Sequence, residues 1–328
     1  MNREEQRQAR DSAHAQDGLR HKTNAEHVAE HYNQRRELGV QGRMHTKITG
    51  LRLFNNWIKS ILIRQFAWPG CKVLDLGCGK GGDLRKWSIA NIAEYVGMDI
   101  AQVSIVQAQK RFTEMTNTRF AARFYAQDCY AVPLEKTMRP PDYQADVISA
   151  QFCLHYAFES EQKARQMMRN VSEHLADGGA FFCTIPNANW LVKKLRASSG
   201  NGFGNTVYSV EFATDSIQRF GTPYSFTLDE AVEDCTEYLV HLPTLVQLAR
   251  EHGLELEYCR DFHGLFADHL ANRASVELLR RMRVIDHERP EISADEWEAV
   301  GIYLAVAFRK PTATNRAPDL ADCQLGQP

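Results

Sequence analysis

The segment that most constrains this chain is residues 73–99, VLDLGCGKGGDLRKWSIANIAEYVGMD. Its apolar start predicts a short buried strand of a parallel sheet. Four glycines follow, and without side chains there a ligand can approach the backbone closely. The next residues predict a helix whose free N–H groups point toward that turn. A second apolar strand ends on Asp99, so the segment predicts half of a nucleotide-binding sheet.

Two classes of ligand bind at a turn of this kind. Gly77, Gly79 and Gly82 satisfy G-x-G-x-x-G, and Asp99 lies at roughly the spacing of about 20 residues that the dinucleotide pattern requires. A nicotinamide dinucleotide therefore remains possible from this motif alone. Asp75, on the strand before the turn, and a lysine inside the turn favour another ligand. The D-x-G-x-G form resembles the first motif of class I S-adenosylmethionine-dependent methyltransferases, in which the acid after the second strand binds the ribose hydroxyls.

The composition is that of an ordinary globular protein. The 328 residues are enough for one large domain or two small ones. The formal net charge of −2 gives no global basic field, so contact with a nucleic acid would need a local patch. The 8 cysteines form no C-x-x-C pair and no Cys/His cluster with zinc spacing, so no metal is expected. Scattered cysteines fit a reducing compartment, the nucleus or the cytosol.

The two ends of the chain are predicted to be flexible polar tails, residues 1–26 and 311–328. The start, MNREEQRQAR, has no apolar core, so no signal peptide is expected. No stretch approaches the ~18 uncharged apolar residues of a membrane span, so no membrane partner is expected. No repeat or low-complexity linker lies between the tails. We therefore expect one domain, residues 27–310, that carries an insertion.

The remaining chain continues an alternation of helix and strand. Apolar residues at positions 51, 54, 58, 61 and 62 predict an amphipathic helix before the first strand. Further elements are predicted at 102–115 (helix), 123–125 (strand), 145–149 (strand), 160–175 (helix) and 180–185 (strand). The pair Gly178-Gly179 is the expected stop signal of the last helix. This order predicts an α/β fold with a doubly wound, mostly parallel sheet.

The alternation breaks after the fifth strand. A loop rich in Gly, Ser and Asn is expected at 197–205, before strands at 207–212 and 224–228. A helix at 243–252 and late strands at 255–262 and 302–308 return to the main pattern. Glu237 is expected just before a short apolar strand that ends at Pro243. An insertion at about 190–240 is where such a fold would carry substrate specificity.

Eight further segments, taken in order, point to one family. They are HYN at 31–33, LFNNWIKSILI at 53–63, LDLGCGKGGDLRKW at 74–87, YVGMDIAQVSI at 95–105, QFCLHYAFES at 151–160, FGN with YSV at 203–210, EYLVHLP at 237–243 and EWEAVGIYLAVAF at 296–308. Together they resemble the eukaryotic mRNA cap guanine-N7 methyltransferase family from about residue 27 to 310. The glycine motif is common to many methyltransferases, whereas NNWIKS with QFCLHYAFES is far more specific. The match is looser over 43–50 and at Leu53, where the family commonly has asparagine.

The resemblance implies a class I methyltransferase fold, S-adenosylmethionine as methyl donor and the capped 5′ end of mRNA (GpppN) as substrate. It also implies a nuclear location, a monomer, and association with a capping enzyme or RNA polymerase II. The positions that it assigns to the donor, with the acid of the glycine motif, are Lys59, Asp75, Gly77, Asp99, Asp128, Gln151 and Tyr156. The positions that it assigns to the cap are Asn55, Asn56, Lys80, Lys86, Arg111, His155, Glu237 and Tyr303.

Taken singly, several of these residues have ordinary structural explanations. His155 could be a satisfied structural histidine, Glu237 an exposed strand residue, Tyr303 a core aromatic and Arg111 a solvated helix end. The order and number of the matches favour the functional interpretation. Three alternatives remain: a class I methyltransferase acting on another RNA or a small molecule, a binding protein that has kept the fold, and a dehydrogenase.

Methylation of guanine N7 uses a ring lone pair that carries no proton, so no general base is expected. Positioning alone can supply roughly 7–11 kcal/mol by aligning N7, the methyl carbon and the sulfur. His155, Tyr156 and Glu237 are expected to position the guanine, with Glu237 accepting from N1–H and the exocyclic amine. The lysines and the arginine of the cap group are expected to hold the triphosphate.

Overall fold

The computed structural model describes residues 24, 28–30, 46–214, 216–285 and 292–312. Almost all of the two predicted tails lies outside the described residues, as does the HYN segment at 31–33 and part of the segment at 43–50. The expectation that the tails are flexible therefore stays a prediction.

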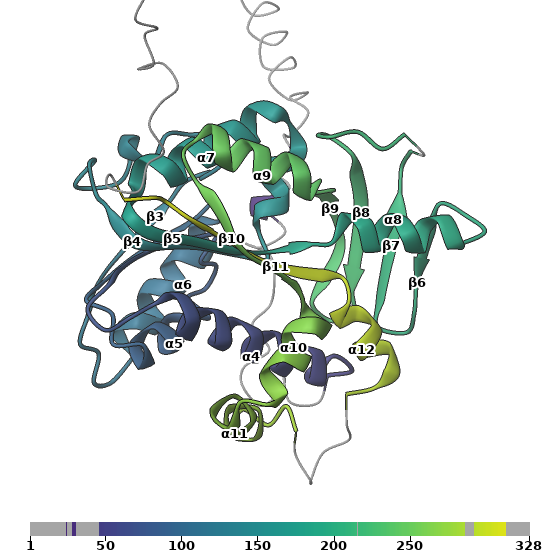
Figure 1. Cartoon of the computed structure of the whole chain (residues 1–328), viewed down its shortest axis with the longest axis horizontal. Coiled ribbons are helices and arrows are strands. Elements are labelled where there is room, and N and C mark those ends of the chain that lie inside the picture. The colour runs from purple at the N-terminus through teal and green to yellow at the C-terminus, as the bar shows by residue number, and fades with distance from the viewer. Residues whose placement is uncertain (1–23, 25–27, 31–45, 215, 286–291, 313–328) are drawn as a thin grey trace, which may run out of the picture.

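A seven-stranded sheet forms the centre of the molecule (Figure 1). Its strands are β1 (Lys72–Leu76), β2 (Glu94–Asp99), β3 (Ala121–Ala126), β4 (Ala145–Gln151), β5 (Leu175–Pro186), β10 (Glu255–Asp261) and β11 (Tyr303–Arg309). They lie in the order β10-β11-β5-β4-β1-β2-β3. Strands β1 to β5 pair in parallel, whereas β11 runs antiparallel to both β5 and β10. The predicted doubly wound, mostly parallel sheet is confirmed.

Helices cover both faces of this sheet. Figure 1 shows α4 (Thr49–Phe66), α5 (Leu84–Ile89) and α6 (Gln102–Thr113) on one face, with α7 (Glu161–His174) and α9 (Leu242–Glu251) on the other. Each face has its own apolar core, because neighbouring residues of a strand point to opposite faces. Val147 of β4 packs with the α4 side and the adjacent Ile148 packs with the α7 side.

Helix α4 is amphipathic, as its apolar spacing predicts. Phe54 and Trp57 are fully buried in it, and the indole of Trp57 donates a hydrogen bond of 3.2 Å to the carbonyl of Ser275. This burial fixes the rotation of the helix, since the apolar stripe must face the core. The polar residues between these aromatics, which include Asn55, Asn56 and Lys59, are then carried on the remaining faces.

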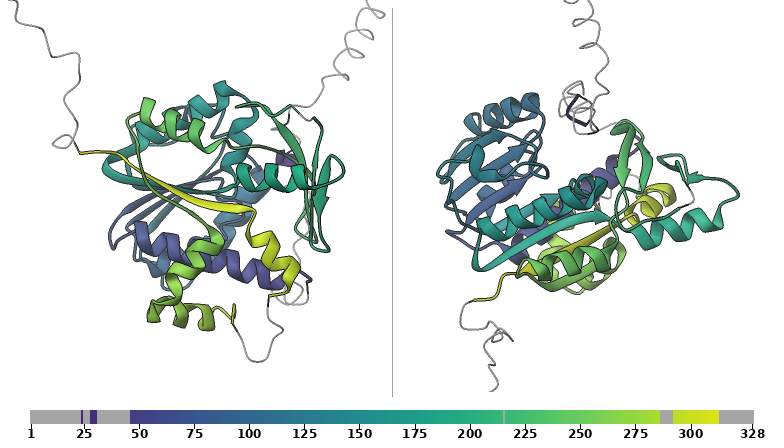
Figure 2. Two further views of the ribbon diagram at one scale, coloured as in Figure 1. Left: turned by 45° about the vertical axis from the view of Figure 1, so that its right-hand side comes forward. Right: turned by 90° about the horizontal axis from the view of Figure 1, so that it is seen from above.

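The insertion after β5 forms a second sheet. Helix α8 (Ala188–Ala197) leads into β6 (Gly202–Gly204), β7 (Tyr208–Phe212), β8 (Pro223–Leu228) and β9 (Val232–Tyr238), which pair antiparallel in chain order. Figure 2 shows this sheet at one side of the central sheet. The two strands predicted inside the insertion are confirmed, whereas α8 and β9 were not predicted. Glu237 lies within β9, so its expected place before a separate apolar strand is wrong.

The pair Gly178-Gly179 was given the wrong role. Helix α7 ends at His174, and the chain enters β5 at once, so both glycines lie inside the strand. Gly178 has φ +78°, and its N–H donates to the carbonyl of Lys310 (2.8 Å). A Cβ on Gly179 would lie 2.7 Å from the carbonyl oxygen of Ala176. The pair therefore allows the chain after β11 to pair closely with β5, and it does not cap the helix.

Three short helices near the end of the chain were also missed: α10 (Phe262–Leu270), α11 (Arg273–Arg281) and α12 (Ala294–Val300). Ser293 and Glu296 form a capping box at the start of α12. The buried Glu296 also accepts a hydrogen bond of 3.0 Å from the backbone of Leu51, which joins α12 to α4. Within the described ranges, no helix has both the length and the apolar character needed to cross a bilayer.

Candidate functional site

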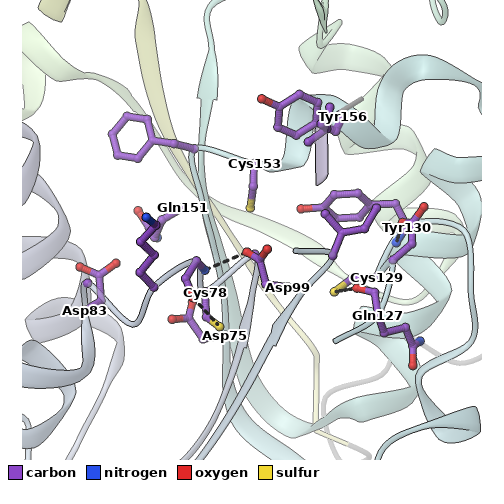
Figure 3. Close-up of a pocket in the computed structure, with 18 of the residues that line it drawn as sticks. Asp75, Cys78, Asp83, Asp99, Gln127, Cys129, Tyr130, Gln151, Cys153 and Tyr156 are labelled. Atoms are coloured by element: carbon purple, nitrogen blue, oxygen red, sulfur yellow. Dashed lines mark hydrogen bonds between the residues drawn. The ribbon is translucent and has the colours of Figure 1, made fainter. Parts of the chain in front are cut away.

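A pocket of about 380 Å³ lies at the carboxyl ends of β1, β2 and β4, where open α/β sheets bind ligands. Figure 3 shows Asp75 and Asp99 on one side of it and Tyr156 on another. We call it the donor pocket. It brings together all seven residues predicted for the methyl donor and two predicted for the cap: Lys59, Asp75, Gly77, Asp99, Asp128, Gln151, Tyr156, Lys80 and Arg111.

The glycine turn forms one wall of the donor pocket. Gly77 has φ +68°, and a Cβ placed on it would lie 2.6 Å from the sulfur of Cys153, so this position requires glycine. The N–H of Gly79 donates to Oδ2 of Asp99 (2.8 Å), and the N–H of Ala101 donates to Oδ1 (2.9 Å). The turn and the acid after β2 are thus joined directly. Each oxygen of Asp99 keeps a lone pair for a further donor.

The two acids Asp99 and Asp128 are both held by the backbone. Burial raises the pKa of Asp99, and its two backbone hydrogen bonds oppose that rise. Asp128 accepts at Oδ1 from the N–H groups of Tyr130 (2.9 Å) and Ala131 (3.1 Å). These bonds leave its Oδ2 without a hydrogen-bond partner among the described residues. The arrangement suits a ligand with a pair of hydroxyls and a further donor, such as the adenosine half of S-adenosylmethionine.

An ion cluster forms the second wall. Asp83 accepts from Nζ of Lys59 at 2.8 Å and from Nζ of Lys86 at 2.7 Å, and Lys86 also donates to Oδ1 of Asn56 at 2.9 Å. Burial alone would raise the pKa of Asp83, but the two ammonium groups outweigh it and hold that pKa well below its usual range. Asp83 is a site residue that sequence reasoning missed, although its place directly after the glycine turn was a usable signal.

Asp75 lies beneath the same cluster and is 3% exposed. Tyr95 donates a hydrogen bond of 2.9 Å to its Oδ2. Burial, followed by the nearby charge of Asp83, raises the pKa of Asp75 to about 7. Lys59 shows the reverse balance, since burial would lower its pKa but the Asp83 carboxylate raises it. Lys59 therefore stays cationic next to the pocket, as a site for a carboxylate requires.

A second cluster lies on the insertion side and includes His155 and Glu237, which are 2% and 6% exposed. Tyr224 donates a hydrogen bond of 2.7 Å to Oε2 of Glu237. Nε2 of His155 lies 3.4 Å from Oε1 of Glu237, and neither ring nitrogen of His155 has a hydrogen-bond partner among the described residues. We call these three residues the guanine cluster. Glu237 is therefore no exposed strand residue, and His155 is no satisfied structural histidine.

The guanine cluster and the donor pocket share one short segment, the 3₁₀ helix η3 (Leu154–Glu159). His155 faces Glu237, and the next residue, Tyr156, lines the donor pocket with its hydroxyl 3.3 Å from the sulfur of Cys235. Cys235 and Glu237 are two apart on β9, so their side chains share one face of the sheet. Adjacent residues of η3 thus contact alternate residues of β9. This contact joins the insertion to the main sheet.

Phe152 provides an aromatic link between the two sites. It lines the donor pocket, and its ring lies 4.9 Å from that of Tyr303, nearly perpendicular to it. Its φ of +59° lies in the left-handed region, which is rare for an aromatic residue. A hydrogen bond of 2.8 Å from its N–H to Oγ1 of Thr184 accompanies this conformation. Such backbone strain is concentrated at functional sites.

Six of the residues predicted for the cap lie outside the lining of the donor pocket: Asn55, Asn56, Lys86, His155, Glu237 and Tyr303. Buried polar atoms without partners mark the region that they share with Gln151. They include Oδ1 of Asn55, Oε1 of Gln151 and both ring nitrogens of His155. Because buried polar atoms are nearly always hydrogen-bonded, these atoms are where ligands would complete the site. The individual roles assigned from the sequence stay predictions.

The parallel sheet with one antiparallel strand, the glycine turn and the acid after β2 define a class I S-adenosylmethionine-dependent methyltransferase fold. Within that class, the chain belongs to the mRNA (guanine-N(7))-methyltransferase family, because the model of that domain matches residues 16–311. This is the family that the sequence resemblance indicates.

Individual relatives agree with that assignment. The mRNA cap guanine-N(7) methyltransferase of Schizosaccharomyces pombe is 42% identical over 295 residues, which cover 86% of this chain and 81% of the relative. The rice protein named mRNA cap guanine-N(7) methyltransferase 1 is 39% identical, with 90% of this chain and 85% of the relative covered. The protein from Cryptococcus neoformans is 45% identical over 86% of this chain, but only 47% of its own length is covered. The chain thus spans about half the length of that relative.

Among solved structures, the CcbJ methyltransferase of Streptomyces caelestis is similar, with a TM-score of 0.50 and 16% identity. The match covers 79% of this chain and 90% of that one. At this identity the likeness supports the fold alone.

Proposed function

We propose that this chain transfers a methyl group from S-adenosylmethionine to N7 of the guanosine cap of mRNA. The observation that carries the proposal is the contact of η3 with β9, which sets a buried acceptor cluster beside a pocket with the features of a donor site. Membership of the mRNA (guanine-N(7))-methyltransferase family supports the same reaction.

The donor pocket would hold S-adenosylmethionine through three features. The lone pairs of Asp99 that are not used by the backbone would accept from the two ribose hydroxyls. Asp128 would accept from the base, and the Lys59 ammonium would face the carboxylate of the methionine part. When bound, S-adenosylmethionine supplies an electrophilic methyl group on a positively charged sulfur.

The guanine cluster would bind and orient the methyl acceptor. Glu237 would accept from guanine N1–H and from the exocyclic amine, a donor pair that adenine lacks. Tyr224 would hold the carboxylate in place through the bond to Oε2. As guanine gains positive charge in the transition state, a buried carboxylate beside it stabilises that charge. The N7 lone pair carries no proton, so no residue is needed as general base.

Catalysis would then come mainly from alignment. Because His155 and Tyr156 are adjacent, the backbone of η3 fixes the distance between acceptor and donor. Fixing two reactants in line can supply roughly 7–11 kcal/mol of the barrier reduction. The basic residues Lys80, Lys86 and Arg111 would hold the triphosphate.

The test is incubation with labelled S-adenosylmethionine and GpppG, followed by mapping of the methylated ring atom. Methylation at N7 is the expected result. Methylation of uncapped RNA or of a small molecule, with none on GpppG, would favour the alternative of a methyltransferase with another substrate.

We further infer that the protein acts in the nucleus on nascent transcripts, as a monomer that associates with the capping enzyme or RNA polymerase II. The support is the nature of the proposed substrate, the mRNA cap. Subcellular fractionation and sedimentation analysis of the purified chain would test the location and the oligomeric state.

A further inference from the structure

A groove of about 490 Å³ lies in the insertion, apart from the donor pocket. One wall is α8, which Figure 1 shows beside the strands of the second sheet. The other wall is formed by residues 217–218, in the connection between β7 and β8, and by residues 239–241 after β9. The polar side chains that line it are Asn189, Lys193, Arg196, Gln218 and His241.

The groove has a basic lining. Lys193 and Arg196 are exposed and lie three residues apart, so they share one face of α8. Among the described residues neither makes an ion pair, whereas Lys194 on the same helix pairs with Glu298. The described residues that line the groove include no Asp or Glu. Two cations without a neighbouring carboxylate attract an anionic ligand.

Both walls of the groove begin next to residues predicted for the cap. Helix α8 starts two residues after Pro186, whose register partner across the sheet is Tyr303. Leu239, on the other wall, lies two residues after Glu237. Two residues of extended chain span at most about 7 Å between Cα atoms. A polyanion attached to a guanine in the guanine cluster would therefore reach the groove within a few nucleotides.

We propose that this groove binds the RNA chain that follows the cap. Lys193 and Arg196 contact two phosphates, and the amides of Asn189 and Gln218 face the riboses or base edges. Ile217, 43% exposed, and the buried Leu239 supply apolar surface along the floor. This inference rests on the proposed function, because it takes the capped transcript as substrate. It adds a site that recognises the RNA chain independently of the cap.

The test compares two substrates in the double charge reversal Lys193→Glu with Arg196→Glu. For a capped RNA of about ten nucleotides, kcat/KM should fall at least about tenfold, whereas kcat/KM for GpppG should stay unchanged. The slope of log K against log salt for RNA binding should decrease by about 1.4, at about 0.7 for each phosphate contact on a single strand. The matched control is Arg119→Glu with Lys136→Glu, the same change in charge on exposed residues beside β3.

Equal losses on both substrates, or equal losses in the control variant, would overturn the proposal. So would tight binding of a phosphoserine peptide that the RNA does not compete away. Binding of the same oligonucleotide without a cap, followed by fluorescence anisotropy, separates this inference from the proposed function. If the wild-type chain leaves GpppG unmethylated but the double variant alone loses uncapped RNA, the function fails and the groove stands.

Discussion

The donor pocket and the guanine cluster differ in what holds their carboxylates in place. In the donor pocket, backbone N–H groups hold Asp99 and Asp128. In the guanine cluster, Tyr224 and His155, two side chains from separate segments, approach Glu237. Backbone contacts follow from local chain geometry, whereas side-chain contacts between distant segments depend on the whole fold. The donor site should therefore tolerate changes elsewhere, and the acceptor site should be sensitive to them.

The largest expected effect is in the donor pocket. Asp99→Ala removes the acceptors for both ribose hydroxyls, and each charged hydrogen bond contributes about 1.5–3 kcal/mol. Binding of S-adenosylmethionine should therefore weaken by about a hundredfold or more, as measured by calorimetry on the folded variant. Asp99→Asn is the matched control, because it keeps the shape and one acceptor and should lose less. Unchanged affinity in a folded Asp99→Ala variant would remove Asp99 from the donor site.

Glu237→Gln comes next and tests the guanine cluster alone. The change keeps the shape but removes the charge and sets an amine against a donor, a loss of about 1.5–3 kcal/mol. We expect kcat/KM for GpppG to fall about ten- to a hundredfold, with the Kd of S-adenosylmethionine nearly unchanged. A parallel loss of donor affinity would show that the two sites are not separable.

Asp75→Asn tests the buried charges beneath the donor pocket through pH. The pKa of Asp75 is raised from 3.8 to about 7 in the folded chain, so the folded state binds more protons than the unfolded state between these values. Its contribution to stability is present below about pH 4 and is lost as the pH rises to about 7. We expect Tm of the Asn variant to fall less than that of the wild type over this range, by a few degrees, or about 1–2 kcal/mol.

Asp142→Asn, which changes an exposed carboxylate, is the control for that measurement. An Asp75→Asn variant whose Tm follows the wild-type pH profile throughout would place the titration on another group.

The smallest effect is expected for Tyr224→Phe, which removes one donor from Glu237. The net loss of such a bond is about 1 kcal/mol, so kcat/KM for GpppG should fall about fivefold. Steady-state kinetics on GpppG would measure it, with Tyr208→Phe on the neighbouring strand β7 as the control. A loss equal to that of Glu237→Gln would mean that the tyrosine contacts the guanine itself.

The central sheet and the donor pocket were predictable because their signals are local. Strand, glycine turn, helix and acid follow each other within residues 73–99, and the turn geometry brings Gly79 to Asp99. Asp83 was overlooked because its function depends on Lys59, which is on a different helix. The role of Gly178-Gly179 was wrong because its partner, Lys310, lies at the far end of the described chain.

The insertion was less predictable for the same physical reason. Strand β9 alternates polar and apolar residues weakly, so its pairing with β8 decides its structure more than its own pattern does. Nothing near Tyr224 indicates that its hydroxyl meets Glu237, because the two lie across a strand pair. Helix α8 did have a signal, the N-cap Asn187, whose side chain accepts from the N–H of Trp190 at 3.2 Å.

The contact between η3 and β9 limits how substrate specificity can be exchanged between enzymes of this fold. A shift of β9 by one residue would turn both Cys235 and Glu237 to the opposite face of the second sheet. The insertion is therefore not an independent cassette: grafted onto another methyltransferase, it would place its carboxylate correctly only if the recipient presents a matching pair at the positions of His155 and Tyr156. Changes in the two segments must accompany each other, so new acceptors should arise through paired substitutions across this contact.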